Sequence, residues 1–462
     1  MALGIQMSKK QNFLVWLSAT LSGLISAIYV LSLKDLIWHP ARDEELNATF
    51  QAFRETGILL VKKAGSGSYG AQATGTSEYV LAGWDDDPGS FILASLLGQL
   101  THSESPYPGL RLFLAFIVFM AGFLLPLLMV KLFQNPFAGY ASLSIPFLSQ
   151  IITGSPLIGS QYGKSDSIST LPTYALYGIA GELVFLGLLG IVWLGTCKIS
   201  AKYLALWTFV GIAYAGVCNL FRSNSGLGIA VGLGVLWAFT LLNKKGLAIS
   251  LLIAVVAVFG SSALQKAAMA PINAPRAEFT SQSLSELPDS HNTWHALYLG
   301  LSWPQPISGK DSEFAITWAD EFGWAKAKQI DPNVVVASSQ YDSILKNLYV
   351  DQVSSHPLSA IELYVEKLLF TLLHYSTEIL LIAAGIFAIV LTKSKQLIAS
   401  TRKSGILILP TILWGFIPAV MVMPMIYFFN ELQAGIGLMV SIAWVGIIVS
   451  LWEKAKQRTS IH

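Results

Sequence analysis

Long apolar segments separated by polar connections constrain this chain more than any other feature. A bilayer core takes about 20 apolar residues per helix, and ten segments meet or approach that length. They lie near residues 12–33, 110–133, 137–153, 172–196, 203–220, 226–242, 247–265, 364–392, 405–427 and 432–452. The third is short and contains Pro146. A backbone in lipid must satisfy its hydrogen bonds internally, so the pattern predicts an all-α polytopic membrane protein.

The composition agrees with lipid as the solvent. Of the 462 residues, 53% are hydrophobic and only 12% are charged, against about 25% charged in soluble domains. The net charge is +2 and no long basic tract is present, so nucleic acid is not an expected partner. Cys197 and Cys218 fall at opposite ends of neighbouring segments, which argues against a disulfide. The first segment follows Lys9 and Lys10 and is long enough for a retained anchor rather than a signal peptide.

Lysine and arginine occupy alternate connections, and this alternation predicts the orientation. The basic connections and the tail carry Lys9, Lys10, Lys131, Lys198, Lys202, Lys244, Lys245, Lys393, Lys395, Arg402, Lys403, Lys454, Lys456 and Arg458. The positive-inside rule makes these connections and both termini cytoplasmic in the cytoplasmic membrane. Two long outer segments follow, 34–109 and 266–363. The expected parts are a membrane module over 1–265, an outer subdomain over 266–363 and a membrane part with three helices over 364–462.

The sequence of the first outer segment predicts two helices. A helix is expected from Glu44 to Lys63, with Gly57 as a stop signal, and Pro88 is placed to open a second helix over 89–100. The glycines of AGSGSYGAQATG match a dinucleotide-binding pattern. That motif needs a helix that begins at its last glycine, which this text does not predict, so a plain loop is expected.

Two stretches of this segment resemble a known family. ARDEELNATFQAFRETG and DDDPGSFILASLLGQLTHSESPYPGLRLFLAF are similar to the GT-C class of membrane glycosyltransferases, in particular the protein O-mannosyltransferase and aminoarabinose transferase branch. The likeness covers 10–265 in layout and 42–57 and 85–115 in motif. It implies a GT-C-like fold and inverting transfer of a sugar from a polyprenyl-phosphate carrier to a lipid, glycan or protein acceptor at the outer face. Asp87-Pro88-Gly89 stands where that branch usually has a doubled proline.

Asp43 and Glu44 are the candidate catalytic residues. The resemblance implies that they are the family's acidic pair and that Asp43 deprotonates the acceptor. The residues alone allow a second interpretation, in which Asp43 caps a helix and Glu44 and Glu45 are solvated charges at the helix start. Adjacent helical residues point about 100° apart, so both carboxylates reach one atom only if Asp43 precedes the first turn.

The run Asp85-Asp86-Asp87 also has two interpretations. It is a candidate site for the acceptor or for a divalent cation, or Asp87 caps the helix that Pro88 opens. Nothing in the sequence requires a metal or another cofactor, and no Cys/His cluster has zinc spacing.

Phosphate and sugar contacts are expected from basic and aromatic residues near the outer face. Arg222, between two spans, is the leading phosphate ligand, with Arg42 and Arg111 as weaker candidates; an arginine that marks the end of a span is the alternative. In the second outer segment, four residues with helical spacing are expected to contact phosphate or sugar, or else to pack a small core. They are His291, Trp294, His295 and Tyr298.

Three ionisable residues fall inside expected spans, where a charge costs about 2.5–3.5 kcal/mol on insertion scales. Glu182, His374 and Glu378 must therefore face protein or a polar cavity. Two alternatives to the GT-C-like transferase stay open. An O-antigen-ligase or polymerase type would use the late outer segment and not Asp43. A lipid or solute transporter would use the polar residues in the spans.

Overall fold

The computed structural model describes residues 7–33, 43–62, 79–80, 88–153, 175–241, 244–280, 287, 292–334, 336, 338–425 and 428–459. Almost all regular structure in these residues is helical, as the sequence predicts. The helices of the first 280 residues are α1 (Lys9–Ser32), α2 (Asp43–Thr56), α3 (Gly89–Leu100), α4 (Tyr107–Phe133), α5 (Pro136–Ala141), η2 (Ser142–Ser144), α6 (Ile145–Thr153), α7 (Ala175–Thr196), α8 (Ala201–Phe221), α9 (Leu227–Leu241) and α10 (Lys244–Thr280).

The remaining helices are α11 (Thr293–Gly300), α12 (Gln305–Ser308), α13 (Asp320–Ile330), α14 (Ser339–Ser355), α15 (Pro357–His374), α16 (Ser376–Leu391), α17 (Lys395–Ile417), the π-helix η4 (Pro418–Val422) and α18 (Asn430–Thr459). The described strands, β1 (Val61–Lys62) and β2 (Tyr79–Val80), form an antiparallel pair in which Val61 faces Val80.

Seven described helices are long and apolar enough to cross a membrane, and an eighth span results if α15 and α16 count as one bent span. The chain is therefore a multi-pass membrane protein. The expected third span is wrong as a continuous helix. Residues 136–153 form two short helices joined by a 3-10 turn, because Asn135 caps a new helix at Pro136 and Pro146 sits in the first turn of α6. The sixth expected span, α9, forms a helix of only 15 residues.

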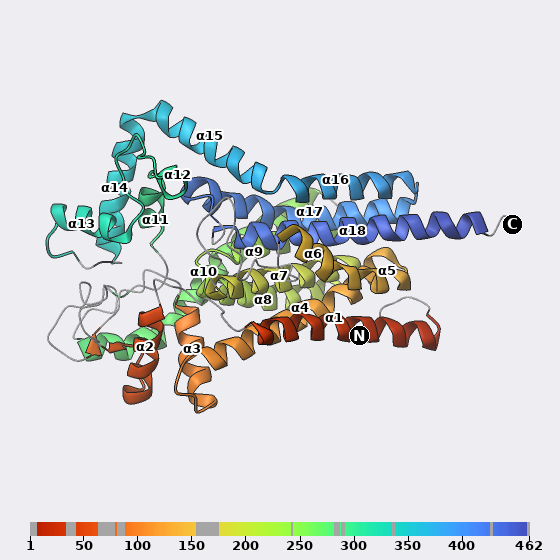
Figure 1. Ribbon diagram of the computed structural model, residues 1–462, viewed down its shortest axis with the longest axis horizontal. Helices are drawn as coiled ribbons and strands as arrows, with labels where there is room; N and C mark the ends of the chain where they lie inside the picture. Colours follow the sequence, from red (N-terminus) through yellow and green to blue (C-terminus); the bar gives the residue numbers. More distant parts are fainter. Residues whose placement is uncertain are drawn as a thin grey trace.

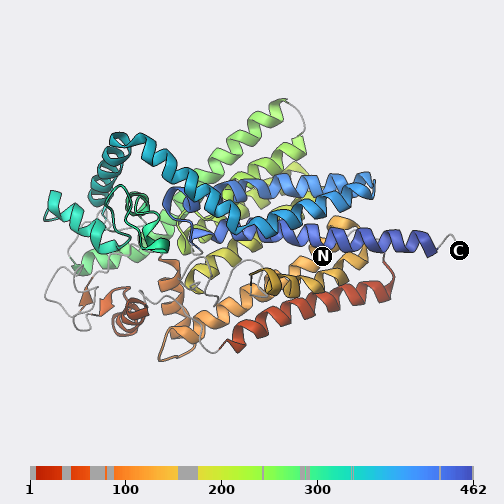
Figure 2. The same cartoon turned by 45° about the horizontal axis from the view of Figure 1, so that its top comes forward.

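The two ends of the helical bundle differ in what they carry. In Figure 1, α1 begins and α18 ends on the right, whereas α2, α11, α13 and α14 gather on the left. The view in Figure 2 keeps the same separation. Both long connections thus extend from the end opposite the start of α1 and the end of α18, which agrees with their common side in the sequence prediction. We call the end with α2 and α11 the outer end and the other the inner end.

Small residues allow the closest helix pairs to approach. A Cβ atom added to Gly122 of α4 would lie 2.8 Å from the carbonyl oxygen of Ser22 and 2.9 Å from Oγ of Ser26 in α1. Lipid tails are as apolar as leucine side chains, so helices in a membrane associate through packing, and small residues at the contact make that packing tight.

The described parts of the first outer segment form short elements at the outer end of the bundle. Helix α2 ends at Thr56, earlier than the expected Lys63, because Gly57 takes a φ of +72° that glycine adopts without strain. The chain then turns back as β1. The Glu55 carboxylate accepts hydrogen bonds from Lys62, at 2.8 Å, and from Tyr79, and these bonds lower the pKa of Glu55. Helix α3 occupies the predicted range 89–100.

The second outer segment forms a subdomain with its own apolar core. Tyr298, Trp303, Phe314 and Tyr341 are buried in it, and the core continues into Val422 and Met423 at the end of η4. Helix α15 leads from this subdomain back to the bundle and meets α16 at a bend of 60°. The expected straight span over 364–392 is therefore two helices that meet at Tyr375.

Substitution of Gly122 tests the contact between α1 and α4. We expect Gly122→Ala to lower the free energy of unfolding by about 1–3 kcal/mol, because its Cβ would overlap backbone and hydroxyl atoms of α1. Gly405 in α17 is the matched control, since a Cβ there meets only the flexible Met439 side chain at 3.6 Å, and alanine favours a helix over glycine. Thermal unfolding in detergent measures both variants. Equal midpoints for the two would contradict the tight contact.

Candidate functional site

A cavity of about 260 Å³ opens at the outer end of the bundle, where the outer subdomain meets the membrane helices. Four parts of the chain line it: the turn between α8 and α9, helix α11, the end of α17 with η4, and the start of α18. The lining residues are Arg222, Ser223, Asn224, Thr293, Ala296, Leu297, Trp414, Ile417, Pro418, Met421, Val422, Phe428 and Glu431. Arg222 and Glu431 are the charged residues of this lining and give a mainly apolar cavity one cation and one carboxylate.

Arg222 is held by a turn with many internal hydrogen bonds. Its backbone N–H donates to the carbonyl oxygen of Cys218 at 3.0 Å, and its own carbonyl oxygen accepts from the backbone of Ser225 at 2.9 Å. The Asn219 side chain accepts from the backbone of Gly226 at 2.8 Å. The indole N–H of Trp414 donates to the Asn224 carbonyl at 2.9 Å. A guanidinium on such a rigid turn is positioned before any ligand arrives.

The Arg222 guanidinium has two partners in the cavity wall. It lies over the Phe428 ring, 4.9 Å from the ring centroid, and it interacts electrostatically with Glu431. Glu431 is only 4% exposed. A buried charge is tolerated when an opposite charge lies close to it, so this pair explains how both groups reside at the membrane boundary. Sequence reasoning found Arg222 and missed Glu431, although Glu431 is the sole carboxylate between Glu378 and Glu453.

Lys367 links two walls of the cavity, the end of α11 and the end of η4. This side chain of α15 is fully buried, and its Nζ donates to the carbonyl oxygens of Gly300 at 2.7 Å and Val422 at 2.6 Å. Gly300 ends α11 and Val422 ends η4. The lysine therefore satisfies two terminal carbonyl groups that the helices leave without an internal partner.

The predicted aromatic and histidine face of α11 lies away from the cavity. His295 is buried, with Nδ1 2.6 Å from the Tyr341 hydroxyl and Nε2 3.1 Å from Oδ1 of Asp320. Trp294 packs against Tyr349, and Tyr298 stacks on Phe322. These residues hold α11 in the subdomain core, and the opposite face of the same helix lines the cavity. His291 lies outside the described residues.

Asp342 of α14 caps α11 from outside the helix. Asn292 occupies the N-cap position of α11 but makes no side-chain cap bond, and the N–H of Trp294 instead donates to Oδ1 of Asp342 at 3.1 Å. Burial raises the pKa of Asp342, while the Trp294 hydrogen bond, His295 and Lys346 act in the opposite direction. The orientation of α11, and with it one wall of the cavity, depends on this contact.

Helix α2 begins at Asp43. The side chains of Asp43 and Glu44 lie outside the described residues, as does all of Arg42. Glu45 corrects one expectation, because it is not solvated: it is 1% exposed and interacts electrostatically with Arg276. Arg276 is itself fully buried and donates from Nη1 to Oδ1 of Asn273 at 2.6 Å.

Arg276 reaches α2 because α10 is much longer than predicted. The sequence suggests a span that ends at residue 265, since Pro271 and Pro275 follow, yet the helix continues to Thr280 with both prolines inside it. The alanine-rich text AAMAPINAPRA favours a helix between the prolines. This extension carries Arg276 beyond the length that a bilayer requires and places it against the start of α2.

The start of α3 abuts the turn that carries Arg222. A Cβ atom added to Gly89 would lie 2.8 Å from the carbonyl carbon and oxygen of Leu220 and 3.0 Å from the backbone nitrogen of Phe221. Only glycine fits this approach. Asp85, Asp86 and Asp87 lie outside the described residues, but Pro88 and Gly89, which follow them directly, are next to the end of α8. The last residue of the DDDPG motif, Gly89, and the end of the helix that precedes Arg222 thus lie side by side.

The polar residues of the spans do not line the cavity. Glu182 of α7 is buried and interacts electrostatically with Tyr214 of α8. His374 and Glu378 flank the bend between α15 and α16. The His374 ring packs against Tyr375 and Phe429, and Glu378 is buried.

Within the described ranges, no three His, Cys, Asp or Glu residues come together as metal ligands. Cys197 and Cys218 are both free thiols.

Comparison of the sequence with protein-family models and with characterised proteins finds no match. Among solved structures, the crystal structure of ArnT from Cupriavidus metallidurans bound to undecaprenyl phosphate is similar to this chain at 13% sequence identity. The alignment covers 95% of this chain and 77% of that chain, with a TM-score of 0.32. At that score no role of any residue is carried from one protein to the other.

The contact between Glu45 and Arg276 predicts a large effect on stability. We expect Glu45→Gln to lower the free energy of unfolding by about 3 kcal/mol, because it leaves the buried Arg276 charge without its carboxylate. Glu55→Gln on the same helix is the matched control and should change the thermal midpoint little, because its ion pair with Lys62 is exposed to solvent and exposed pairs contribute little to stability. An unchanged midpoint for Glu45→Gln in detergent would contradict the buried pair.

The Asp342 cap predicts a dependence of stability on pH. Asp342→Asn keeps an acceptor for Trp294, whereas Asp342→Ala loses it and should destabilise the protein by about 1 kcal/mol. The pKa of Asp342 is raised in the folded state, so folding favours the neutral acid. The wild type should therefore lose stability relative to Asp342→Asn as pH rises through that raised pKa, with no difference below about pH 3.8. A difference in stability between the wild type and Asp342→Asn that grows as the pH falls would contradict this prediction.

Proposed function

We propose that this protein is an inverting glycosyltransferase of the GT-C type that takes a sugar from a polyprenyl-phosphate carrier. Two independent features support the proposal. The sequence has the family's order of an acidic pair, a helix, an acidic residue with proline, a second helix and a span that starts Arg-Leu. The structure has a cavity at one membrane boundary with a fixed arginine, and this observation carries the proposal.

The cavity suits the chemistry of the donor. A polyprenyl-phosphate sugar needs a cation for its phosphate and an apolar surface for its sugar face and tail. Arg222 offers a planar guanidinium that can bind two phosphate oxygens at once, and Trp414 and Phe428 offer aromatic rings beside it. Glu431 would partner Arg222 before the donor binds, and the monoanionic phosphodiester of the donor would then compete for the same guanidinium, which the additional charge of the released phosphate monoester would bind more strongly.

The proposed reaction is a single displacement. The acceptor hydroxyl or amine attacks the anomeric carbon of the sugar, a new C–O or C–N bond forms, and the bond between that carbon and the phosphate oxygen breaks. The electron pair leaves with the polyprenyl phosphate, whose developing charge Arg222 stabilises. The proton of the acceptor passes to a carboxylate, which the family resemblance assigns to Asp43. Asp85, Asp86 and Asp87, which directly precede Pro88 and Gly89 in the sequence, are proposed to contribute to the acceptor side.

The face of the membrane forms part of the proposal. Basic residues concentrate at the inner end, so the positive-inside rule places the inner end in the cytoplasm and the cavity outside. The donor would then be a carrier already exposed to the outer leaflet.

Substitutions of Asp43 and Arg222 test the proposal. We expect Arg222→Gln to reduce sugar transfer from a radiolabelled polyprenyl-phosphate sugar by about 10²–10³-fold. Arg222→Lys should recover part of the activity, because lysine keeps the charge and loses the fork geometry. Asp43→Asn should leave the protein folded and inactive. Lys328→Gln, an exposed residue near the end of α13, is the control for loss of a positive charge at the same end of the molecule.

One alternative is favoured by a specific observation. The late outer segment contributes α11 to the cavity, as an O-antigen-ligase or polymerase type of transferase would require. Transfer that survives Asp43→Asn and disappears with Arg222→Gln would favour that type. Full activity of both variants would show that the cavity is not the site of sugar transfer.

A further inference from the structure

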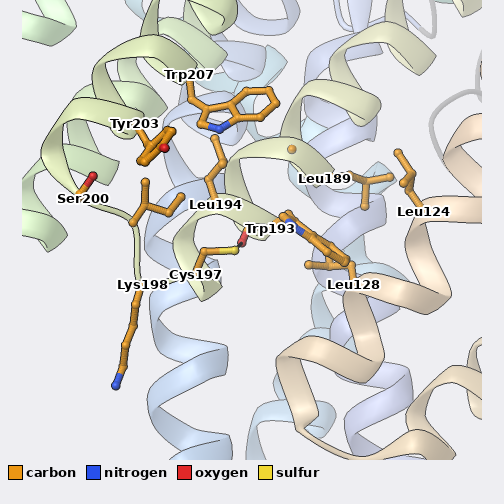
Figure 3. Close-up of a pocket in the computed structure, with 12 residues that line it drawn as sticks. Leu124, Leu128, Leu189, Trp193, Leu194, Cys197, Lys198, Ser200, Tyr203 and Trp207 are labelled. Atoms are coloured by element: carbon orange, nitrogen blue, oxygen red, sulfur yellow. Dashed lines mark hydrogen bonds between the residues drawn. The ribbon is translucent and has the colours of Figure 1, made fainter. Parts of the chain in front are cut away.

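A second, larger cavity lies at the inner end, and the proposed sugar transfer makes no use of it. Its volume is about 640 Å³, within the range of about 300–1,000 Å³ that is usual for ligand sites. Helices α4, α7 and α8 form its walls (Figure 3). We propose that it is a binding site for one anionic phospholipid of the surrounding bilayer.

The shape of the cavity matches a lipid chain that enters from the membrane. The lining runs along α7 from Leu189 to the end of that helix at Thr196, a rise of about 10 Å, which is most of one leaflet of about 15 Å. Tyr203 and Trp207 on α8 border the cavity and are 64% and 46% exposed, so this wall faces lipid. A chain can therefore slide in sideways.

The charged group of the lining lies at one end of the cavity. In Figure 3 the Lys198 side chain extends away from Tyr203 and Trp207, so that its amine and the aromatic rings are at opposite ends. Lys198 and Ser200 belong to the connection between α7 and α8, at the membrane surface. Leu124 and Leu189 line the apolar part. This distribution corresponds to a headgroup at the surface and an acyl chain below it.

A second lysine reaches the same end through the cavity wall. The Lys131 amine lies 2.8 Å from Sγ of Cys197 and 4.3 Å from the centroid of the Trp193 ring, and both partners line the cavity. Lys403 of α17 interacts electrostatically with Cys197 as well. Three lysines thus surround the mouth, from α4, from the connection after α7 and from α17.

None of the residues that line this cavity is Asp or Glu. The sequence contains no Asp or Glu from residue 105 to 165, from 183 to 277 or from 379 to 430, and these ranges include every lining residue. Ser200 lines the cavity and is the N-cap of α8, and it makes no side-chain cap bond to the first backbone N–H groups of that helix. A phosphate diester is the anion that a membrane supplies at this depth, and it fits both the lysines and the start of α8.

Charge must select the lipid, since the acyl chain cannot. A lipid tail gains little by moving from other tails to leucine and tryptophan side chains. Juxtamembrane lysines, by contrast, attract anionic headgroups. The site should therefore distinguish phosphatidylglycerol from phosphatidylcholine with the same chains, and the binding should weaken when the lysines are removed.

Gly190 allows a direct test of the cavity. It lines the cavity, and a Cβ atom added to it meets nothing within 4 Å. Gly190→Phe should therefore fill the space without a clash, and Gly190→Ala is the matched control that leaves most of it open. Dioleoyl phosphatidylglycerol retained by the purified full-length protein is measured by native mass spectrometry, with dioleoyl phosphatidylcholine in parallel.

We expect the wild type and Gly190→Ala to retain one phosphatidylglycerol, about tenfold more than phosphatidylcholine at equal concentration. Gly190→Phe should lose it. The double variant Lys131→Gln, Lys198→Gln should bind both lipids equally, whereas Lys9→Gln, Lys10→Gln at the start of α1, on the same membrane face, should behave as the wild type. This double variant keeps the test decisive if Gly190→Phe fails to fold.

Labelling of Cys197 gives an independent readout, because the fully buried Cys218 does not compete for the reagent. Phosphatidylglycerol should slow maleimide labelling of Cys197 in wild-type protein and not in Gly190→Phe.

Equal retention of phosphatidylglycerol by the wild type and Gly190→Phe would show that the lipid does not bind in this cavity. Stronger retention of a polyprenyl phosphate than of phosphatidylglycerol would overturn the choice of occupant.

Discussion

The cost of a charge in hydrocarbon determines where this protein can place its functional groups. Only 12% of its residues are charged, and several of those at the outer membrane boundary are held by partners. Arg222 lies beside Glu431 and over Phe428, and Lys367 binds two helix-terminal carbonyl groups. Just above the bundle, Arg276 meets Glu45. The walls of the outer cavity depend on the first two of these arrangements.

The outer cavity joins parts of the chain that are far apart in sequence. The turn after α8, helix α11, the end of α17 and the start of α18 meet there, and the start of α3 packs against the same turn through Gly89. Asp342 and Lys367 fix the two ends of α11. A rigid cation inside such a frame costs little reorganisation when a phosphate binds, which is the property that electrostatic catalysis requires.

Local features of the sequence predicted most of the fold. Hydropathy located the long helices and Pro88 marked the start of α3, because each depends on neighbouring residues alone. Gly57 was noted as a stop signal, but the helix was expected to continue to Lys63, whereas α2 ends at Thr56. The break at 142–144 and the bend at Tyr375 were missed, since a long apolar run does not reveal a kink. The extension of α10 was missed because Pro271 and Pro275 suggested an end that packing overrides.

Only the part of the candidate site that shows in the local sequence could be predicted. Arg222 stands out as the sole basic residue between Lys202 and Lys244, and the structure places it in the cavity. Glu431 and Lys367 form their contacts with residues that are distant in sequence, so no local pattern identified them. The helical spacing of Trp294, His295 and Tyr298 was correct, but spacing cannot tell which face of α11 packs and which lines a cavity.

The central claim is that Arg222 holds the phosphate of a polyprenyl-linked donor at the outer end of the bundle. A structure determined in lipid nanodiscs with a non-hydrolysable polyprenyl-phosphate sugar analogue tests it most directly. The account predicts density for the phosphate within hydrogen-bonding distance of the Arg222 guanidinium, with the sugar beside Trp414 or Phe428. Phosphate density at the inner cavity near Lys198, with the outer cavity empty, would contradict it.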